Sequence, residues 1–256
     1  DGKKIGYLFY AGFYADSHSK LADVFSYFQG EQVTDLILDL RYNLGGDAKT
    51  PSYLASLFAP YNVVKKKSVF LTQTWNDLYM DYFKGTGEDM NTYFHPDIPV
   101  NLNLSRVYVL TTGSTASASE ATISGLTPYM DVIKIGEKSY GKYCGAALIT
   151  PKDASGKDDL EISNWLLTLV IYKFVNTQGF TEFKDGIAPD YEASDSGLMA
   201  GIPLGSPEDP LVAKALELIT GRATKAPALK MPAGVGLIPH MGEDVTRGGM
   251  KSIVNL

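Results

Sequence analysis

The sequence predicts an α/β protein, because segments with strand character alternate with segments that have the periodicity of a helix. Short runs rich in branched apolar and aromatic residues predict the strands. Runs with apolar residues every three or four positions predict the helices, and glycine, proline and capping residues mark their ends. The expected strands are 4–10, 35–40, 69–73, 106–110, 132–136, 146–150 and 165–174, and the expected helices are 18–29, 50–58, 118–126 and 210–219.

The first half of the chain begins with an aromatic strand, KIGYLFY, at 4–10. The helix at 18–29 carries its apolar residues on one face, and Gly30 can end it. The strand DLILDL at 35–40 is apolar enough to be buried, and it runs into a loop with two adjacent glycines. Pro51 suits the first turn of the helix that follows this loop.

In the second half, strand 106–110 leads through a turn into the helix at 118–126. The strand at 165–174 is the longest and lies in the most apolar stretch of the chain, so we expect it to be buried. The final helix can be capped by Asp209 and ended by Gly221.

We expect one core, residues 1–221, with an insertion or lid at 74–104 and a tail at 222–256. The insertion is rich in aromatic residues, which could line a peptide groove or pack the insertion onto the core. The tail is rich in proline, glycine and methionine and has little periodicity, which is typical of an extended tail or a surface wrap.

The chain has 256 residues and a formal net charge of −6, which argues against a nucleic-acid-binding protein because such proteins usually present a basic face. The single cysteine, Cys144, excludes an internal disulfide and offers no cysteine cluster for a metal. No apolar run is long enough to cross a bilayer. The sequence points to no cofactor or metal, and it does not indicate an oligomeric state.

The most informative motif is TTGSTASASE at 111–120, which places Ser117 where a turn leads into a helix. A helix N-terminus presents free N–H groups and the positive end of a dipole, so a serine there could act as a nucleophile with its oxyanion stabilised. The same residues fit a capping box, in which Ser117 caps the helix and Glu120 returns the contact. The local sequence leaves both roles open.

Lys142 follows Ser117 by 25 residues and offers an amine as the base, since none of the three histidines is near in sequence. A lysine accepts a proton only when neutral, and serine–lysine pairs are a recognised nucleophile–base arrangement. Gly45 and Gly46, with the N–H of Ala118, are candidate donors to an oxyanion. The alternatives are an exposed loop lysine and an ordinary glycine turn.

Taken together and in this order, these pieces resemble the C-terminal processing (tail-specific) serine protease family. The motifs D-L-R-x-N-x-G-G and S-A-S-E are specific, and the resemblance runs from about residue 4 to 221, the insertion and the tail excepted. The matching segments are KIGYLFYAGF at 4–13, DLILDLRYNLGG at 35–46, VYVLTTGSTASASE at 107–120, IGEKSYGK at 135–142 and GIAPD at 186–190.

The resemblance implies a ClpP/crotonase-like core and a serine endopeptidase that acts near unstructured protein C-termini, outside the cytoplasm in the bacterial periplasm or cell envelope. Ser117 would be the nucleophile, Lys142 the base, and Gly45 and Gly46 would supply oxyanion contacts. Arg41 would hold the glycine loop in shape. A protein or peptide substrate would bind as an extended strand through main-chain hydrogen bonds. Many members also carry a PDZ domain before the core, and none is visible within residues 1–256.

Four positions depart from the family pattern. Many members have a glutamine where this chain has Ala146, some have an aspartate where it has Pro128, and small residues are replaced by Tyr143 and Cys144. These departures leave the serine and lysine in place but remove the candidates for a third member. They motivate an alternative, a non-catalytic peptide-binding module on the same fold. A nucleophilic Cys144 and an acyl-CoA enzyme are weaker alternatives.

Overall fold

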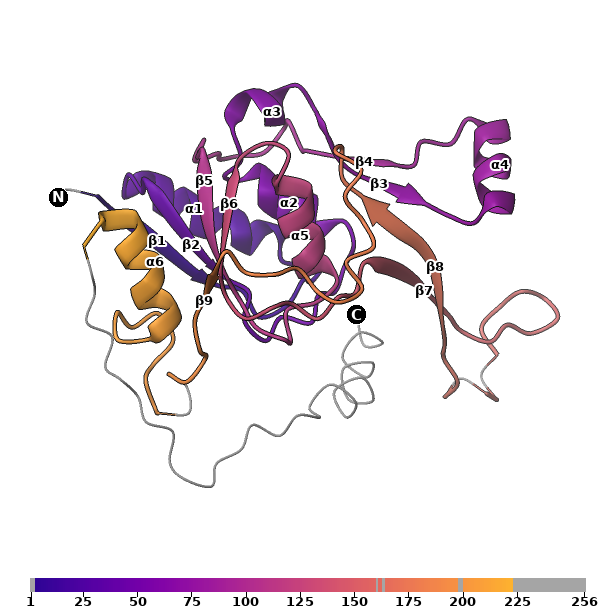
Figure 1. Cartoon of the computed structure of the whole chain (residues 1–256). Coiled ribbons are helices and arrows are strands. Elements are labelled where there is room, and N and C mark those ends of the chain that lie inside the picture. Colours follow the sequence, from indigo (N-terminus) through magenta and orange to yellow (C-terminus); the bar gives the residue numbers. More distant parts are fainter. Residues whose placement is uncertain (1–2, 160, 163, 198–199, 223–256) are drawn as a thin grey trace.

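The computed structural model describes residues 3–159, 161–162, 164–197 and 200–222, and it confirms the α/β class (Figure 1). The tail expected at 222–256 lies outside the described residues except for Arg222. The helices are α1 His18–Gly30, α2 Thr50–Ser56, α3 Tyr61–Lys65, α4 Asp77–Thr86, α5 Ala118–Leu126 and α6 Pro210–Thr220. The strands are β1 Ile5–Phe9, β2 Asp35–Asp39, β3 Val69–Thr74, β4 Asn91–Tyr93, β5 Arg106–Thr111, β6 Asp131–Gly136, β7 Cys144–Ile149, β8 Leu167–Val175 and β9 Tyr191–Glu192.

A parallel sheet with the order β1-β2-β5-β6-β9 forms the centre of the molecule. Side chains of β2 alternate between its two faces, so that Leu36 and Leu38 pack toward α1, α2 and α5 while Ile37 packs toward α6. All five residues of β2 are buried, as expected for a strand covered on both faces by helices. The carboxyl ends of these strands carry the loops that form the candidate site.

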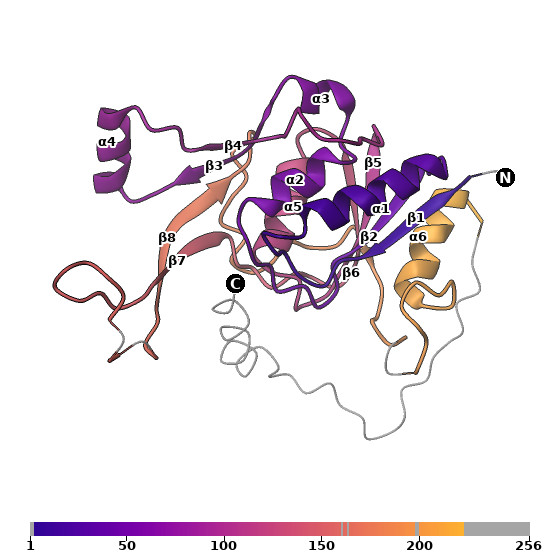
Figure 2. The same ribbon diagram turned by 180° about the vertical axis from the view of Figure 1, so that it is seen from behind.

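A second sheet is antiparallel, with the order β4-β3-β8-β7. Figures 1 and 2 show that it projects from the helix-covered centre, with α4 at one end and the β7–β8 ribbon at the other. The residues expected to form an insertion, 74–104, contain α4 and β4, which lie in the projecting part of the molecule. They also contain a later segment whose Phe94, Val100 and Leu104 are part of the core. Within the described residues, no helix is long and apolar enough to span a bilayer.

The expectation that 165–174 forms a buried strand is wrong in its burial. The strand exists as β8, but it lies in the projecting ribbon, and most of its first half is exposed. Trp165, just before it, is 73% exposed. The error has a physical reason: an apolar run indicates that a surface can be covered, but within the described residues no helix or second sheet packs on the faces of the outer β7–β8 ribbon (Figures 1 and 2).

Candidate active site

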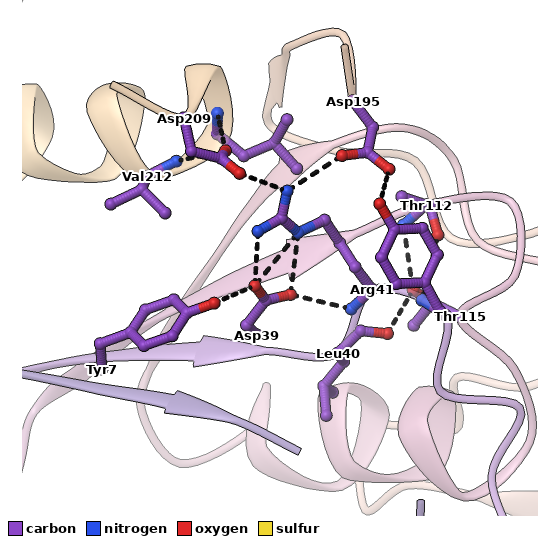
Figure 3. Close-up of polar contacts among 11 residues, drawn as sticks. Tyr7, Asp39, Leu40, Arg41, Thr112, Thr115, Asp195, Asp209 and Val212 are labelled. Atoms are coloured by element: carbon purple, nitrogen blue, oxygen red, sulfur yellow. Dashed lines mark hydrogen bonds and ion pairs between the residues drawn. The ribbon is translucent and has the colours of Figure 1, made fainter. Parts of the chain in front are cut away.

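The loop after β2 is anchored by the buried guanidinium of Arg41 (Figure 3). Its Nε and Nη2 donate to the carboxylate of Asp39 at 2.7–3.1 Å, and its Nη1 donates to Asp195 at 2.9 Å and to Asp209 at 2.8 Å. The hydroxyl of Tyr7 donates to the same Asp39 carboxylate at 2.6 Å. Arg41 therefore joins the end of β2 to two acidic residues more than 150 positions away in the chain.

Burial alone would lower the pKa of Arg41, but the adjacent carboxylates of Asp39 and Asp209 outweigh this effect and raise it. A buried charge that is fully paired is stable in place, whereas removal of one partner leaves an uncompensated charge. The expectation that Arg41 holds this loop, and does not act chemically, is consistent with this geometry because its guanidinium is surrounded by acidic partners.

Asn43 shapes the glycine loop from within. Its Nδ2 donates to the carbonyl of Tyr10 at 2.7 Å, and its Oδ1 accepts from the N–H of Gly45 at 2.9 Å. Its own carbonyl accepts from the N–H of Ala116 and from the hydroxyl of Ser119, both at 3.0 Å. The completely buried Asn43 thus ties the glycine loop directly to the turn that carries Ser117.

Ser117 precedes the first residue of α5 and has an unusual backbone, with φ 57° and ψ −111°. An ordinary N-cap residue has an extended backbone, so helix capping alone does not explain this conformation. The hydroxyl faces the amide of Glu120 as in a capping box, without a capping hydrogen bond of ordinary geometry. Gly45 lies so close that a Cβ there would come within 2.8 Å of the Ser117 Cβ and of the Ala118 nitrogen, which requires glycine at this position.

The three candidate oxyanion donors differ in availability. The N–H of Gly45 is already bonded to Asn43. In the described part of the chain, the N–H groups of Gly46 and Ala118 donate to no partner. Because Gly45 lies against the Ala118 nitrogen, the glycine loop and the start of α5 meet beside Ser117.

The buried carboxylate of Glu120 links the serine to the lysine. Its Oε2 accepts from the main-chain N–H of Ser117 and from that of Lys142, each at 2.9 Å. Its Oε1 accepts from the N–H of Gly141 at 2.6 Å and from the hydroxyl of Ser139. Burial raises the pKa of Glu120, and these four hydrogen bonds oppose that shift. One oxygen atom therefore holds the backbones of Ser117 and Lys142 side by side.

The Lys142 side chain is half-buried, and within the described residues its amine has neither a hydrogen bond nor an ion pair. In particular, it is not hydrogen-bonded to the Ser117 hydroxyl. The loop around it is nonetheless fixed. The amide of Tyr140 donates to the carbonyl of Thr115 at 2.9 Å, and Gly141, with φ 101°, lies where a Cβ would come within 2.3 Å of the Lys184 carbonyl oxygen.

The sequence motifs do not by themselves assign a role to Asn43 or Ser139, although both residues lie within them. Ser139 exchanges hydrogen bonds with Ile187 of the GIAPD segment and donates to Glu120, so it fastens the lysine loop at two points. A signal for Asn43 was present, since a polar residue between a buried strand and two glycines often orders a loop through its side chain. No comparable signal marked Ser139.

Comparisons with known proteins agree with this arrangement. The model of peptidase family S41 matches residues 4–193. A carboxyl-terminal-processing protease of Synechocystis sp. is 26% identical over 222 residues, which are 86% of this chain and 45% of the relative. A crystal structure of a candidate S41 protease from Bacteroides fragilis is 30% identical with a TM-score of 0.73, over 86% of this chain and 55% of that one.

The photosystem II D1 C-terminal processing protease shares the fold, with a TM-score of 0.52 at 18% identity over 73% of this chain and 42% of that one. This chain thus spans about half the length of the relatives that it matches. The family match covers both the glycine loop after β2 and the segment that contains Ser117 and Lys142. The chain belongs to peptidase family S41.

Proposed function

We propose that this chain is the catalytic core of a serine endopeptidase that cleaves polypeptides near unstructured C-termini. The observation that carries the proposal is the shared Glu120 oxygen, which holds the main chains of Ser117 and Lys142 together. The N–H groups of Gly46 and Ala118, which have no partner among the described residues, lie beside them. The curated relative, a carboxyl-terminal-processing protease, supports the substrate class. The resemblance also supports a location outside the cytoplasm, in the periplasm or cell envelope, which cell fractionation tests.

In the proposed reaction, the neutral amine of Lys142 takes the proton of the Ser117 hydroxyl as the oxygen attacks the scissile carbonyl. The N–H groups of Gly46 and Ala118 stabilise the oxyanion that forms. Lys142 then gives the proton to the leaving amine, and water hydrolyses the acyl-enzyme with Lys142 again as the base. Because the side chains of Ser117 and Lys142 are not hydrogen-bonded to each other, the proposal requires the lysine side chain to turn toward Ser117 when substrate binds.

The decisive experiment combines labelling and cleavage. A fluorophosphonate should label Ser117, and the protein should cleave unfolded peptides, while Ser117→Ala and Lys142→Ala should abolish cleavage with little change in melting temperature. Ser114→Ala and Lys138→Ala are matched controls in the neighbouring loops and should remain active. Active Ser117→Ala protein that is less stable by about 1 kcal/mol would assign the serine to helix capping. Peptide binding without labelling or cleavage would establish the non-catalytic module.

A further inference from the structure

The β7–β8 ribbon presents an apolar surface that begins beside the candidate site and that no other part of the described chain covers. We propose that this ribbon, residues 144–149 and 167–175, binds the polypeptide that is to be cleaved, with an extended apolar segment of that polypeptide added as a strand to the free edge of β7. The inference rests on the proposed peptidase function and names where and what the enzyme binds.

Both faces of the outer ribbon are apolar and open to solvent. Ile149 and Leu167 are paired on one face of the ribbon. Leu148, Thr168 and Val170 lie on the other face. Leu167 is 55% exposed and Val170 is 68% exposed. Contiguous apolar surface of this kind on a soluble protein is typical of a binding site, since single exposed apolar residues are ordinary but paired strands of them are not.

The ribbon is covered only near its base. There the ring of Tyr172 lies against Gly145, where a Cβ would come within 2.0 Å of it, and Trp75 packs on Tyr172 with ring centroids 5.6 Å apart. Figures 1 and 2 show the outer part of the ribbon projecting away from the helices. The base of the ribbon is therefore covered, whereas the apolar residues of its outer part have no cover within the described chain.

The free edge of β7 starts next to the catalytic candidates. β7 is the last strand of its sheet and begins at Cys144, two residues after Lys142. Among the described residues, nothing is hydrogen-bonded to its outer edge. An unpaired edge is a template for an incoming strand, because its N–H and C=O groups need partners. Ala146 and Ala147, beyond the position that Tyr172 covers, are small and leave room for the side chains of a paired segment.

The chemistry of the ribbon indicates an apolar partner. β7 contains no charged residue, and in β8 the first charge is Lys173, at the base, where it pairs with Glu182. Farther out, beyond the end of β7, Lys152 pairs with Asp158. A second copy of this chain could also cover the apolar surface of the ribbon, but self-association would not require the unpaired edge of β7 to begin beside Lys142. A substrate polypeptide that must reach Ser117 accounts for both the apolar surface and the position of the unpaired edge.

The test measures binding separately from catalysis. In the Ser117→Ala protein, the dissociation constant of a fluorescein-labelled unfolded peptide with a leucine- and valine-rich centre is measured by anisotropy. The double substitution Leu148→Thr and Ile149→Thr, in β7 itself, exchanges two exposed apolar residues for β-branched polar ones and should raise the dissociation constant roughly tenfold. Tyr27→Gln, at an exposed aromatic residue of α1, is the matched control and should leave it unchanged.

Hydrogen exchange locates the bound peptide without any ribbon variant. Peptide binding should slow hydrogen exchange in residues 144–149. Two peptides are then compared, one with N-methyl groups on the odd-numbered residues and one with them on the even-numbered residues. The peptide whose N-methyl groups fall on the residues that would donate to β7 should lose both binding and protection. Protection elsewhere, or an unchanged dissociation constant in the double variant, would overturn the inference. So would sedimentation data in which the double variant changes only self-association. Labelling of Ser117 in the wild-type protein tests the proposed function independently of these results.

Discussion

The backbone of Ser117 has a strained conformation, which the contacts of its neighbours enforce. A non-glycine residue with φ 57° and ψ −111° costs on the order of 1–3 kcal/mol, and it persists only when the surroundings enforce it. Gly45 leaves room on one side, and Glu120 holds the Ser117 N–H on the other. The strained conformation places the residue where the glycine loop meets the start of α5, which suits a nucleophile better than a simple cap.

Glu120 gives a prediction about how the free energy of unfolding changes with pH, and its sign is opposite to that of most carboxylates. Its pKa is raised in the folded protein, so above the ordinary glutamate pKa the native state binds more protons than the unfolded state. This residue's contribution to the free energy of unfolding therefore falls as pH rises toward the folded pKa, and is constant above it. Glu120→Gln should be less stable by about 2 kcal/mol, because an amide cannot accept from all four donors. The stability advantage of wild type over the variant should shrink as pH rises from about 4.3.

Urea unfolding at a series of pH values measures this difference directly. Glu137→Gln is the matched control, because Glu137 is an exposed glutamate in the same region and should show no such trend. An advantage of wild type that grows with pH would mean that the four hydrogen bonds dominate over burial and that the folded pKa lies below the ordinary value.

At the scale of elements, the four predicted helices and the seven predicted strands are all present, and the elements not predicted are α3, α4, β4 and β9. α5 covers the predicted residues 118–126, and α6 is capped by Asp209 and followed by Gly221 in the left-handed conformation, as expected. Short-range rules set these ends. α4 was not predicted, because its aromatic residues were interpreted as part of an insertion, although Leu78, Tyr79, Tyr82 and Phe83 recur at helical spacing.

The candidate site likewise contains residues that could be predicted from the sequence and residues that could not. Ser117, Lys142 and the two glycines could be named because each lies in a short motif whose order in the chain is informative. Asp195 and Asp209 could not be identified as partners of Arg41, since nothing local to them indicates an arginine more than 150 residues earlier. The shared role of Glu120 was likewise hidden: its capping-box contact is local, but its bonds to Ser139, Gly141 and Lys142 depend on tertiary packing.

Asp209 has two separable tasks at the start of α6. Its Oδ1 accepts from the N–H groups of Leu211 and Val212, and its Oδ2 accepts from Arg41. Asp209→Asn keeps the cap but turns an amide toward the guanidinium, and should lower the free energy of unfolding by about 2 kcal/mol. Asp209→Ala should cost about 1 kcal/mol more, through the lost cap.

Chemical denaturation of both variants, with Glu208→Gln as an exposed neighbouring control, separates the two contributions. Equal losses for Asp209→Asn and Asp209→Ala would show that the cap contributes nothing beyond the ion pair. A loss in Asp209→Asn no larger than in the control would show that Asp39 and Asp195 suffice for Arg41.

The whole molecule combines a covered centre with an open extension. Helices cover both faces of the parallel sheet, whereas the antiparallel sheet is buried only where Phe70, Leu71 and Phe174 reach the core. Ser117 and the glycine loop lie on the rigid centre, and Lys142 lies where the chain passes from the centre into the ribbon. The proposed nucleophile is thereby held in place, and the surface proposed to bind the substrate lies next to it.

This division predicts a wide spread of local stabilities in the protein without ligand. Amides of β2 and β5 should exchange only through global unfolding, because both strands are paired on each side and buried on each face. Amides of the outer ribbon around Leu148 and Leu167 should exchange far faster, through local opening, since a two-stranded ribbon alone is marginally stable. Hydrogen exchange followed by mass spectrometry measures both in one sample. Equal protection of ribbon and centre at low protein concentration would contradict this prediction, because it would show that the ribbon has its own source of stability.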